Sequence, residues 1–526
     1  MPNDADASTK IIPPLPPALS SRNPLEWLRL FGPGAVIASL TIGTGELIFS
    51  SRGGVIFGYP ILFLFTVICV LKWTLAYSAA RHMVISGAHP FQRWMAMPVV
   101  PRGSLPMLFF LLAAAFIPVW ISFHASVLGD LIAGLTHTKP FLGGATIHLW
   151  GAALVLGIVA LSLSGGYSAL EKIQIIVVTL MLAAVMVTLI IFQPDWLDFL
   201  GSFVVPQRLE YPAWLFADSR PAMRQIAERP VWVELSLYAG VIGGAGYDYL
   251  AYTSYIRDKA WGNAAAIERE PVDSSEEASR MFNSIAADMA PRTWLRAPLI
   301  DCTLSFLVVL IFTSVFVASG KLVLGPEHQI PGDGAFLEHQ AQFVTRIHPW
   351  LYPLYLVAVF LTMGGTLYGT LEIAPTILRE VAVAIWPRSP RARDFAGLRR
   401  WAIWWCAAGA LIVLAASFIY QIRMGEEKPP GLTTLLIPVN LFTGVFACGL
   451  ICLCNPWIDR RLPSEFRMPL LLQALNAVAG VVFIVVALRG YWDFAGWIAM
   501  VILTGILAAG IVIAKLFNAT ASASQS

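Results

Sequence analysis

The sequence predicts an all-α polytopic membrane protein of about twelve transmembrane helices, for three reasons. Hydrophobic residues make up 57% of the chain and charged residues only 13%, whereas about a quarter of the residues in soluble proteins are charged. Apolar stretches of about 20 residues, each long enough to cross a hydrocarbon core roughly 30 Å thick, recur along the chain. Two of these stretches are interrupted by glycines beside a carboxylate. Strands are not expected, because in lipid they need a closed barrel with alternating polar and apolar residues.

The apolar stretches place the expected elements in chain order. We expect spans at 31–50, 57–81, 105–135, 148–166, 173–193, 231–256, 299–320, 350–383, 401–421, 431–455, 469–488 and 493–516. They divide the chain into an N-terminal tail (1–30), a first five-helix repeat (31–193), an extracytoplasmic loop (194–230), a second five-helix repeat (231–455) that contains a partly helical cytoplasmic loop (257–298), two additional helices (456–516) and a C-terminal tail (517–526).

Positive residues set the orientation, because cytoplasmic loops carry an excess of Lys and Arg. With the N-terminus inside, most outer loops hold one or two positive residues, 194–230 excepted. The inner loops hold Arg81, Arg93, Arg102, Lys172, Arg257, Lys259, Arg292, Arg296, Arg388, Arg391, Arg393, Arg399, Arg400, Arg460, Arg461 and Arg467. The N-terminal segment has no apolar core and does not resemble a signal peptide. We therefore expect a multi-pass protein of the inner (plasma) membrane with both termini in the cytoplasm.

No cofactor, nucleic-acid partner or obligate protein partner is expected, and the lipid bilayer is the expected surrounding. One helix cannot supply a closed tetrahedral zinc site, so the six cysteines are interpreted as small buried hydrophobes: Cys69, Cys302, Cys406, Cys448, Cys452 and Cys454. An enzyme is not expected, since no nucleophile–base or phosphate-loop motif occurs.

Two spans carry the strongest functional signal. The first reads FGPGAVIASLTIGTGELIFSSRGG, where Gly43 and Gly45 precede Glu46. The sixth reads ELSLYAGVIGGAGYDYLAYTSY, where a glycine cluster precedes Asp248. Each glycine costs a helix about 1 kcal/mol relative to Ala. A carboxylate at bilayer depth costs about 2.5–3.5 kcal/mol on insertion scales and normally marks a substrate or ion path. Both helices are therefore expected to be broken at these points.

The positions of the two breaks indicate an inverted repeat. GTGE and AGYD share a small residue, two intervening residues and an acid, and they lie five spans apart. An odd number of spans inverts the second unit relative to the first, and paired broken helices point to a binding site at the membrane midplane. The alternative is that the glycines allow tight helix packing and the acids pair with buried Lys72 or His124.

At these residues the sequence resembles the Nramp family of divalent-metal transporters. The segments that carry the resemblance are FGPG, LAYSAARHMVISGAHPF after the second span, Asp301 near the start of the seventh, TLYGTLEIAPTILRE in the eighth and LLIPVNLFTG in the tenth. The resemblance implies a LeuT-like fold of two inverted five-helix repeats with helices 1 and 6 broken. It also implies transport of a divalent metal ion by alternating access.

The chain departs from that family at the metal-binding motifs. Gly43, Thr44, Gly45 and Glu46 stand where the family has DPGN, so the binding aspartate is absent and the asparagine position is Glu46. Where the family has MPHN, the sequence has Ala245, Gly246, Tyr247 and Asp248, so the sulfur ligand is lost. Asn440 corresponds to the family's glutamine in the tenth helix. The family's histidine is Tyr247 and its third-helix acids align with Phe123 and Ser126, although Asp130 and His124 lie nearby. Proton coupling by the usual groups is therefore not expected.

The expected site is a hard cation site. Glu46 and Asp248 bring two negative charges, which balance a divalent ion. Asn440, Thr44 and the backbone carbonyls of Gly43, Ile242 and Ala245 are the expected remaining ligands. Without a sulfur ligand this set favours Mg²⁺, Mn²⁺ or Ca²⁺ over softer ions. The loss of the methionine is similar to what is seen in magnesium-carrying relatives of the family, which supports the same preference.

Other polar groups leave alternatives open. Lys72 is interpreted as structural, or as a neutralising partner of Glu46 or Asp248, which would argue against a divalent ion. Thr370 and Glu372 on the eighth span could form a second cation site, and Asp301 could take part in coupling. The rival function on the same fold is a Na⁺-coupled carrier of a small organic solute. Glu46 would repel an amino-acid carboxylate and allow an organic cation. A receptor derived from a transporter is a further alternative, but such proteins usually show a large soluble output domain.

Overall fold

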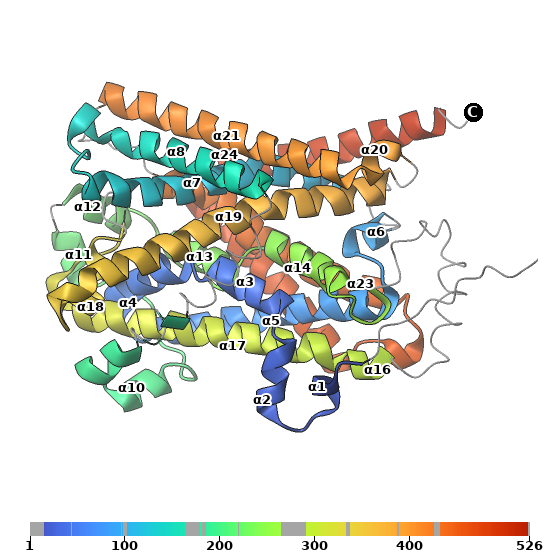
Figure 1. Ribbon diagram of the computed structural model, residues 1–526, viewed down its shortest axis with the longest axis horizontal. Helices are drawn as coiled ribbons and strands as arrows, with labels where there is room; N and C mark the ends of the chain where they lie inside the picture. The colour runs from blue at the N-terminus through green and yellow to red at the C-terminus, as the bar shows by residue number, and fades with distance from the viewer. Residues whose placement is uncertain are drawn as a thin grey trace, which may run out of the picture.

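The computed structural model describes residues 15–523 apart from residues 44, 96, 98–102, 165–178, 181–182, 184–185, 219, 265–290, 333–336, 387–388 and 425–431. The expected cytoplasmic loop at 257–298 therefore lies largely outside the described residues, and the expected fifth span at 173–193 is described only in part, mainly over 186–193. In the described part the chain folds into helices that run roughly along the long axis of the molecule (Figure 1).

The first half of the chain opens with a broken helix. Three short segments, α1 (Pro17–Ser20), α2 (Pro24–Trp27) and η1 (Leu28–Leu30), lead into α3 (Pro33–Thr41), the π-helical η2 (Gly45–Ser50) and α4 (Ser51–Phe57). They are followed by α5 (Ile61–Ser86), α6 (Pro90–Trp94), α7 (Ser104–Leu135), η3 (Phe141–Gly144) and α8 (Thr146–Leu163).

The first broken helix runs farther than the expected span at 31–50. Gly53 and Gly54 lie beyond the end of the expected span, but both are inside α4. A Cβ on Gly54 would overlap the backbone of Val317, and one on Gly320 would overlap that of Ser51. These glycines therefore allow two helices to pack closely and do not end the helix.

The segment before the second half consists of short helices: α10 (Trp196–Gly201), α11 (Ala213–Ala217) and α12 (Pro221–Ala227). The second half again opens with a broken helix, α13 (Val231–Val241) and α14 (Gly246–Asp258). It continues through α16 (Pro291–Trp294), α17 (Arg296–Ser319), η5 (Gly320–Leu324), η6 (Gly325–Glu327), η7 (His339–Ala341), α18 (Gln342–Thr345), η8 (Pro349–Leu351), α19 (Tyr352–Ile385), α20 (Pro390–Arg393), α21 (Phe395–Met424), α22 (Leu432–Asn440), the π-helical η9 (Leu441–Phe446), α23 (Ala447–Asp459) and η10 (Ser464–Phe466).

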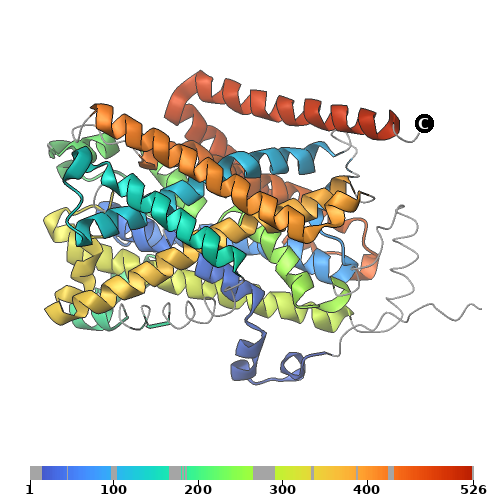
Figure 2. The same cartoon turned by 45° about the horizontal axis from the view of Figure 1, so that its top comes forward.

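The last helix, α24 (Leu470–Ala523), contains both of the expected C-terminal spans. Its backbone leaves the helical region at Ala495 and Gly496, where Gly496 has φ +58°. Figure 2 shows the resulting sharp bend. The boundary between the two spans thus lies at a left-handed glycine, a few residues beyond the loop expected at 489–492.

Eight helical segments among the described residues are long and apolar enough to cross a membrane. The expected count is higher for three reasons. The halves of the two broken helices are too short to be counted, the fifth span is only partly described, and α24 contains two expected spans in one helix. The hydrophobic core between the helices consists of apolar side chains from nearly every long helix.

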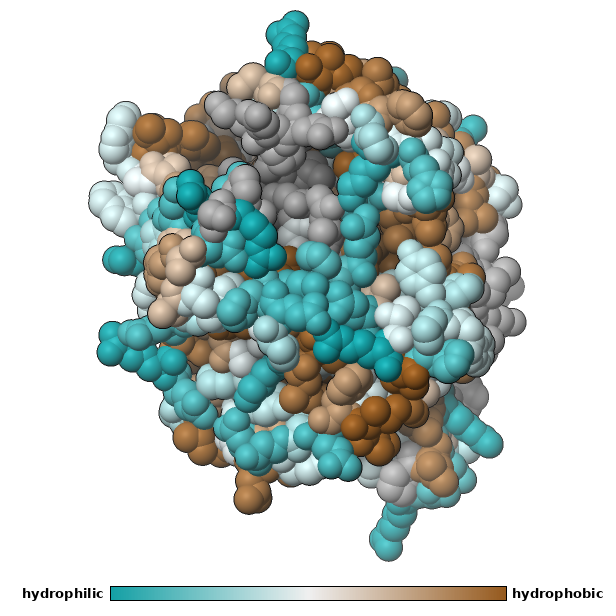
Figure 3. Space-filling view, turned by 90° about the vertical axis from the view of Figure 1, so that its left-hand side faces the viewer, coloured by the Kyte–Doolittle hydropathy of each residue, from teal (hydrophilic) through white to brown (hydrophobic). Residues whose placement is uncertain are grey.

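Short helices lie at both ends of the molecule. The short helices α10, α11, α12 and α18 gather at the left-hand end in Figure 1, and α6, α16 and α20 lie toward the opposite end. Figure 3 looks onto the left-hand end, where hydrophilic residues form a broad band across the middle. A polar surface at the end of an apolar bundle is expected where spans leave the bilayer.

Candidate functional site

The break in the sixth span is set by glycine geometry. α13 ends at Val241, and the chain passes Ile242 in an extended conformation. Gly243 (φ +77°) and Gly244 (φ +98°) then adopt left-handed backbone conformations that favour glycine. The break leaves carbonyls at the end of α13 without helical partners. α14 begins anew at Gly246, as the glycine cluster predicts.

The break in the first span is shorter. α3 ends at Thr41, and the chain resumes at Gly45 as a π-helix. The amide of Leu47 already donates to the carbonyl of Gly43 at 3.1 Å. π-Helical turns widen a helix and are frequent at functional sites. Thr44, an expected ligand, lies outside the described residues.

The two breaks touch each other. A Cβ on Gly45 would stand 2.9 Å from the carbonyl oxygen of Val241, and one on Gly244 would stand 2.7 Å from the Thr41 methyl group. Glu46 Oε1 accepts a hydrogen bond of 3.1 Å from the amide of Gly243. The first break is therefore joined to the second by a carboxylate–backbone contact as well as by close packing.

Glu46 and Asp248 lie in different surroundings. Glu46 is fully buried, and its Oε2 has no hydrogen-bond partner among the described residues. Asp248 is half-buried, and its Oδ2 accepts a 2.6 Å hydrogen bond from the amide of Ala245 at the start of α14. A carboxylate is favourable at a helix N-terminus. The remaining oxygen of Asp248 is not used by this cap.

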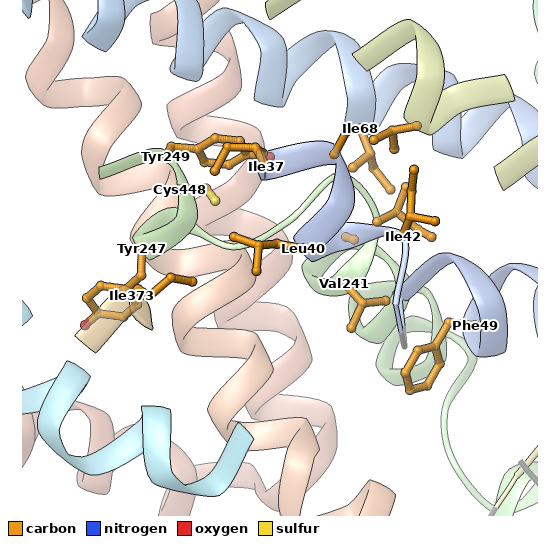
Figure 4. Packing of buried hydrophobic residues seen from close by; sticks show 14 of the residues in the cluster. Ile37, Leu40, Ile42, Phe49, Ile68, Val241, Tyr247, Tyr249, Ile373 and Cys448 are labelled. Atoms are coloured by element: carbon orange, nitrogen blue, oxygen red, sulfur yellow. The ribbon is translucent and has the colours of Figure 1, made fainter. Parts of the chain in front are cut away.

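A cavity of about 70 Å³ lies beside the breaks. Asp248 lines it, together with Gly45, whereas Glu46 is not among the lining residues. Leu40 of α3, Tyr247 of α14 and Ile373 of α19 form part of its apolar lining, and Figure 4 shows these three side chains among the buried hydrophobic residues. Because one water needs at least about 10–15 Å³ of such space, the cavity has room for several waters or a partly hydrated ion.

Four threonines supply most of the remaining polar side chains of the cavity wall. Each hydroxyl donates a hydrogen bond of 2.8–3.2 Å to a backbone carbonyl of its own helix; the donors are Thr41, Thr366, Thr370 and Thr443. A hydroxyl that donates in this way keeps lone pairs for a guest. Trp120 donates its indole N–H to Thr443 at 3.1 Å, and Tyr247 donates its hydroxyl to the carbonyl of Phe109 at 2.9 Å. The threonine hydroxyls therefore offer acceptors to the cavity, and the donors of Trp120 and Tyr247 are already used within the protein.

Lys72 has an unexpected role. Its side chain is fully buried, so it does not reach toward the membrane surface. Its ammonium group donates to the backbone carbonyls of Gly240 at 3.2 Å, Ile242 at 2.7 Å and Gly244. Within the described residues it forms no salt bridge, neither with Glu46 nor with Asp248. The carbonyl of Ile242, an expected metal ligand, is thus occupied by the chain's own cation.

Asn440 lies at the end of α22, where α13 and η9 meet. Its Nδ2 donates to the carbonyl of Leu237 at 2.9 Å, and its buried Oδ1 has no partner among the described residues. A Cβ on Gly240 would overlap the Asn440 amide. Asn440 therefore packs behind Gly240, which itself lines the cavity.

Of the residues considered for proton coupling, some line the cavity and one does not. His124 lines the cavity and stacks on Trp120, with ring centroids 5.5 Å apart. Asp130 does not line it, and instead pairs with Lys139 at 2.9 Å. Tyr247 lines the cavity through its ring, while its hydroxyl is engaged as described above.

The two residues of the expected second cation site have different surroundings. Thr370 lines the cavity, but Glu372 accepts hydrogen bonds from Ser162 at 2.6 Å and Arg399 at 2.5 Å, at the contact of α8, α19 and α21. Because Arg399 already neutralises Glu372, this carboxylate is not left for a cation.

Asp301 holds the start of the first broken helix rather than a bound ion. Its two carboxylate oxygens accept hydrogen bonds from the amides of Gly32 at 3.0 Å and Gly34 at 2.8 Å, and Tyr252 donates to it at 2.8 Å. The FGPG motif thus serves as a helix start capped by a carboxylate from α17.

Sequence reasoning missed two features of the site. The first is the contact of Lys72 with the carbonyls of the second break, and the second is the buried position of Glu234. Glu234 forms a buried ion pair with Arg52, with Nε–Oε1 at 2.5 Å and Nη2–Oε2 at 2.9 Å. A usable signal existed, since an Arg and a Glu inside apolar spans normally require a partner.

Comparison with known proteins identifies the fold of the chain. No protein-family model and no curated protein matches the chain. Among solved structures the chain is similar to an Nramp-type manganese transporter from Eremococcus coleocola, solved in complex with an aromatic bis-isothiourea substituted compound. The identity is 15%, 98% of each chain is covered, and the TM-score is 0.65.

A more distant similarity points to the same architecture. A nucleobase-cation-symport-1 family transporter in a closed conformation with bromovinylhydantoin bound shares 14% identity, with 94% of this chain and 93% of that chain covered and a TM-score of 0.50. The predicted LeuT-like fold with broken helices 1 and 6 is confirmed.

Proposed function

We propose that the chain is a membrane transporter that moves a divalent metal cation by alternating access, with the ion bound in the cavity at Asp248. Transport is secondary-active or uncoupled, and no catalytic step is involved. In such folds one bundle of helices rocks against the rest around a site at the membrane midplane. The proposed place is the inner (plasma) membrane, with both termini in the cytoplasm.

The observation that carries the proposal is that acceptor oxygens outnumber free donors among the polar side chains of the cavity wall, where His124 is the only further polar group of the described residues. Asp248 is the only residue with a formal charge among the described lining residues, and the threonine oxygens face the same space with their protons already committed. The indole N–H of Trp120 and the hydroxyl of Tyr247 are likewise used within the protein. A guest without donors or positive charge would leave these acceptors unpaired, so a cation is the best-matched guest.

The ligand types favour a hard, partly hydrated ion. Carboxylate and hydroxyl oxygens suit Mg²⁺, Mn²⁺ or Ca²⁺, and Mg²⁺ in particular keeps several waters and uses one or two carboxylates. No group of three or more His, Cys, Asp or Glu side chains suited to hold a metal occurs among the described residues, which fits an ion that retains waters. Glu46 places a second carboxyl group behind the cavity wall, one residue beyond the lining residue Gly45. The fold shared with a manganese transporter supports the same class of substrate.

Binding and uptake of Mn²⁺ test the proposal directly. We expect Mn²⁺ and Mg²⁺ to raise the unfolding temperature of the purified protein, and Mn²⁺ to enter proteoliposomes that contain it. Asp248→Asn should weaken binding by roughly tenfold or more, because a lost charge–charge contact at low dielectric is worth more than about 1.4 kcal/mol. The matched control is Glu210→Gln, whose side chain is 62% exposed in the loop before α11. Unchanged Mn²⁺ binding by the Asp248 variant would contradict the proposal.

A small organic cation is the second candidate, as the solute of a Na⁺-coupled carrier. The indole ring of Trp120 and the apolar side chains of Leu40, Ile117 and Ile373 line the cavity beside Asp248. An aromatic face near a carboxylate also suits an ammonium group, because the ring attracts cations. Trp120→Leu separates the two: it should leave Mn²⁺ uptake largely intact, whereas it should abolish uptake of an organic ammonium ion.

A further inference from the structure

The second break offers a group of carbonyls that face a side chain of the protein itself. The oxygens of Gly240, Ile242 and Gly244 converge on one point, where Lys72 Nζ lies. A fourth carbonyl of the break, that of Gly243, accepts from the Tyr249 hydroxyl. An ammonium has three donors, and here each has one carbonyl, so the group is fully satisfied.

The side chain that fills this point comes from outside the broken helix. Lys72 lies in the middle of α5, which packs against α14 and α17. Its methylene chain contacts the break, since a Cβ on Gly243 would stand 3.4 Å from Lys72 Cδ. The ammonium is completely shielded from solvent. Burying an ammonium is costly, and nothing in the helix-forming tendency of α5 requires a lysine there.

Convergent carbonyls of an unwound helix are also the usual ligands of alkali cations in membrane proteins, because they replace the ion's water shell. The same geometry that satisfies an ammonium therefore suits a monovalent metal ion of similar size. The carboxylates Glu46 and Asp248 form no ion pair with Lys72 within the described residues. Lys72 is thus bound by the oxygens of the break itself and not by either acid.

We propose that the Lys72 ammonium takes the place of a bound alkali cation, so that the chain carries a tethered cation where a free coupling ion would otherwise bind. This inference rests on the proposed transport function. It makes two statements about the molecule. Transport by the native chain does not depend on Na⁺ or K⁺, and removing the lysine side chain creates a site for such an ion.

Two substitutions at one position test the second statement. Lys72→Ala removes the ammonium and leaves space for an ion, whereas Lys72→Met removes the charge but fills most of the same volume. In choline chloride both variants should transport Mn²⁺ at least about tenfold more slowly than the native chain, because three buried carbonyls lose their donors. Replacing choline by Na⁺ or K⁺ at equal ionic strength should restore uptake by Lys72→Ala in a saturable manner. Lys72→Met should not recover.

Thermal unfolding of the full chain in detergent gives a readout that needs no transported substrate. The unfolding temperature of Lys72→Ala should rise saturably in Na⁺ or K⁺ relative to choline. The native chain, Lys72→Met and the control Lys515→Ala, an exposed lysine near the end of α24, should not respond. This readout also works for a variant that reconstitutes poorly. A response of Lys72→Ala without any Mn²⁺ binding by the native chain would overturn the proposed function but not the alkali-cation site.

Three outcomes would overturn the inference. One is Mn²⁺ uptake by the native chain that requires Na⁺ or K⁺. Another is an equal recovery of Lys72→Ala and Lys72→Met, which would mean a general salt effect. The third is the absence of any alkali-cation response in Lys72→Ala, in uptake and in unfolding alike, which would leave Lys72 as a helix-end cap only.

Discussion

Gly240 shows how a single missing side chain shapes the site. A Cβ at this position would overlap the Asn440 amide, and a Cβ on Gly444 would overlap the Gly240 backbone. Small residues allow helices in membranes to approach closely, and here they let η9 lie directly against α13. The same residue lines the cavity and gives a carbonyl to Lys72. Glycine is therefore required at Gly240 for packing as well as for access to its backbone.

Gly240→Ala should lower stability by about 1–3 kcal/mol, the usual cost of overpacking. The measurement is the unfolding temperature in detergent. Gly364→Ala in α19 is the matched control, because a Cβ there meets nothing within 4 Å. The control should be neutral or stabilising, since Ala is the better helix former. Adding Asn440→Ala to Gly240→Ala should recover part of the loss; a purely additive effect would mean that the amide is not the obstacle.

The two broken helices are connected at both of their halves. α4 and α13 are joined by the Arg52–Glu234 ion pair, which is almost completely buried, and Tyr238 donates a further 2.7 Å hydrogen bond to Glu234. At the other halves, Asp301 of α17 accepts from the start of α3 and from Tyr252 of α14. The elements around the cavity are thus held by one charged contact on each side of the breaks.

Glu234→Gln should destabilise the protein by about 3–5 kcal/mol, because it leaves the Arg52 guanidinium buried without its counter-charge. Glu327→Gln removes the acid of a much more exposed pair with Arg346 and should cost less than about 1 kcal/mol. Both values come from unfolding of the purified variants. Equal effects of the two substitutions would show that burial does not set the strength of the Arg52–Glu234 pair.

The whole molecule has a polar end built from short helices and an opposite end that receives α6, α16 and α20. Arg391 and Arg393 belong to α20, and Arg257 lies in the last turn of α14. This distribution matches the excess of positive residues in loops that face the cytoplasm.

A reporter fused to the C-terminus tests the orientation. We expect a fluorescent-protein fusion to be bright and an alkaline-phosphatase fusion to be inactive, because the first matures in the cytoplasm and the second requires the oxidising side of the membrane. Fusions that replace the loop before α11 should give the reverse pattern. An active phosphatase at the C-terminus would refute the predicted topology.

The sequence was sufficient for the fold because its signals are local. Apolar length gives the spans, and the glycines around Gly43 and Gly243 give the breaks. Which side chains form hydrogen bonds or ion pairs with each other depends instead on packing between segments that are far apart in the sequence. Lys72 and Ile242 are separated by 170 positions, and Arg52 and Glu234 by 182. Local patterns do not specify such pairs, and the pairing of Glu372 with Arg399 from another helix is a further example.

The buried lysine also bears on the energetics of transport. Its charge is covalently bound to α5, so a working cycle leaves it on neither side of the membrane. In the proposed transport cycle without a coupling ion, the net charge moved per turnover is then that of the substrate alone. For a divalent ion, two charges crossing a potential of 100 mV correspond to about 4.6 kcal/mol, from about 2.3 kcal/mol for each. At about 1.4 kcal/mol per factor of ten, membrane voltage without any ion gradient would support an accumulation of about a thousandfold.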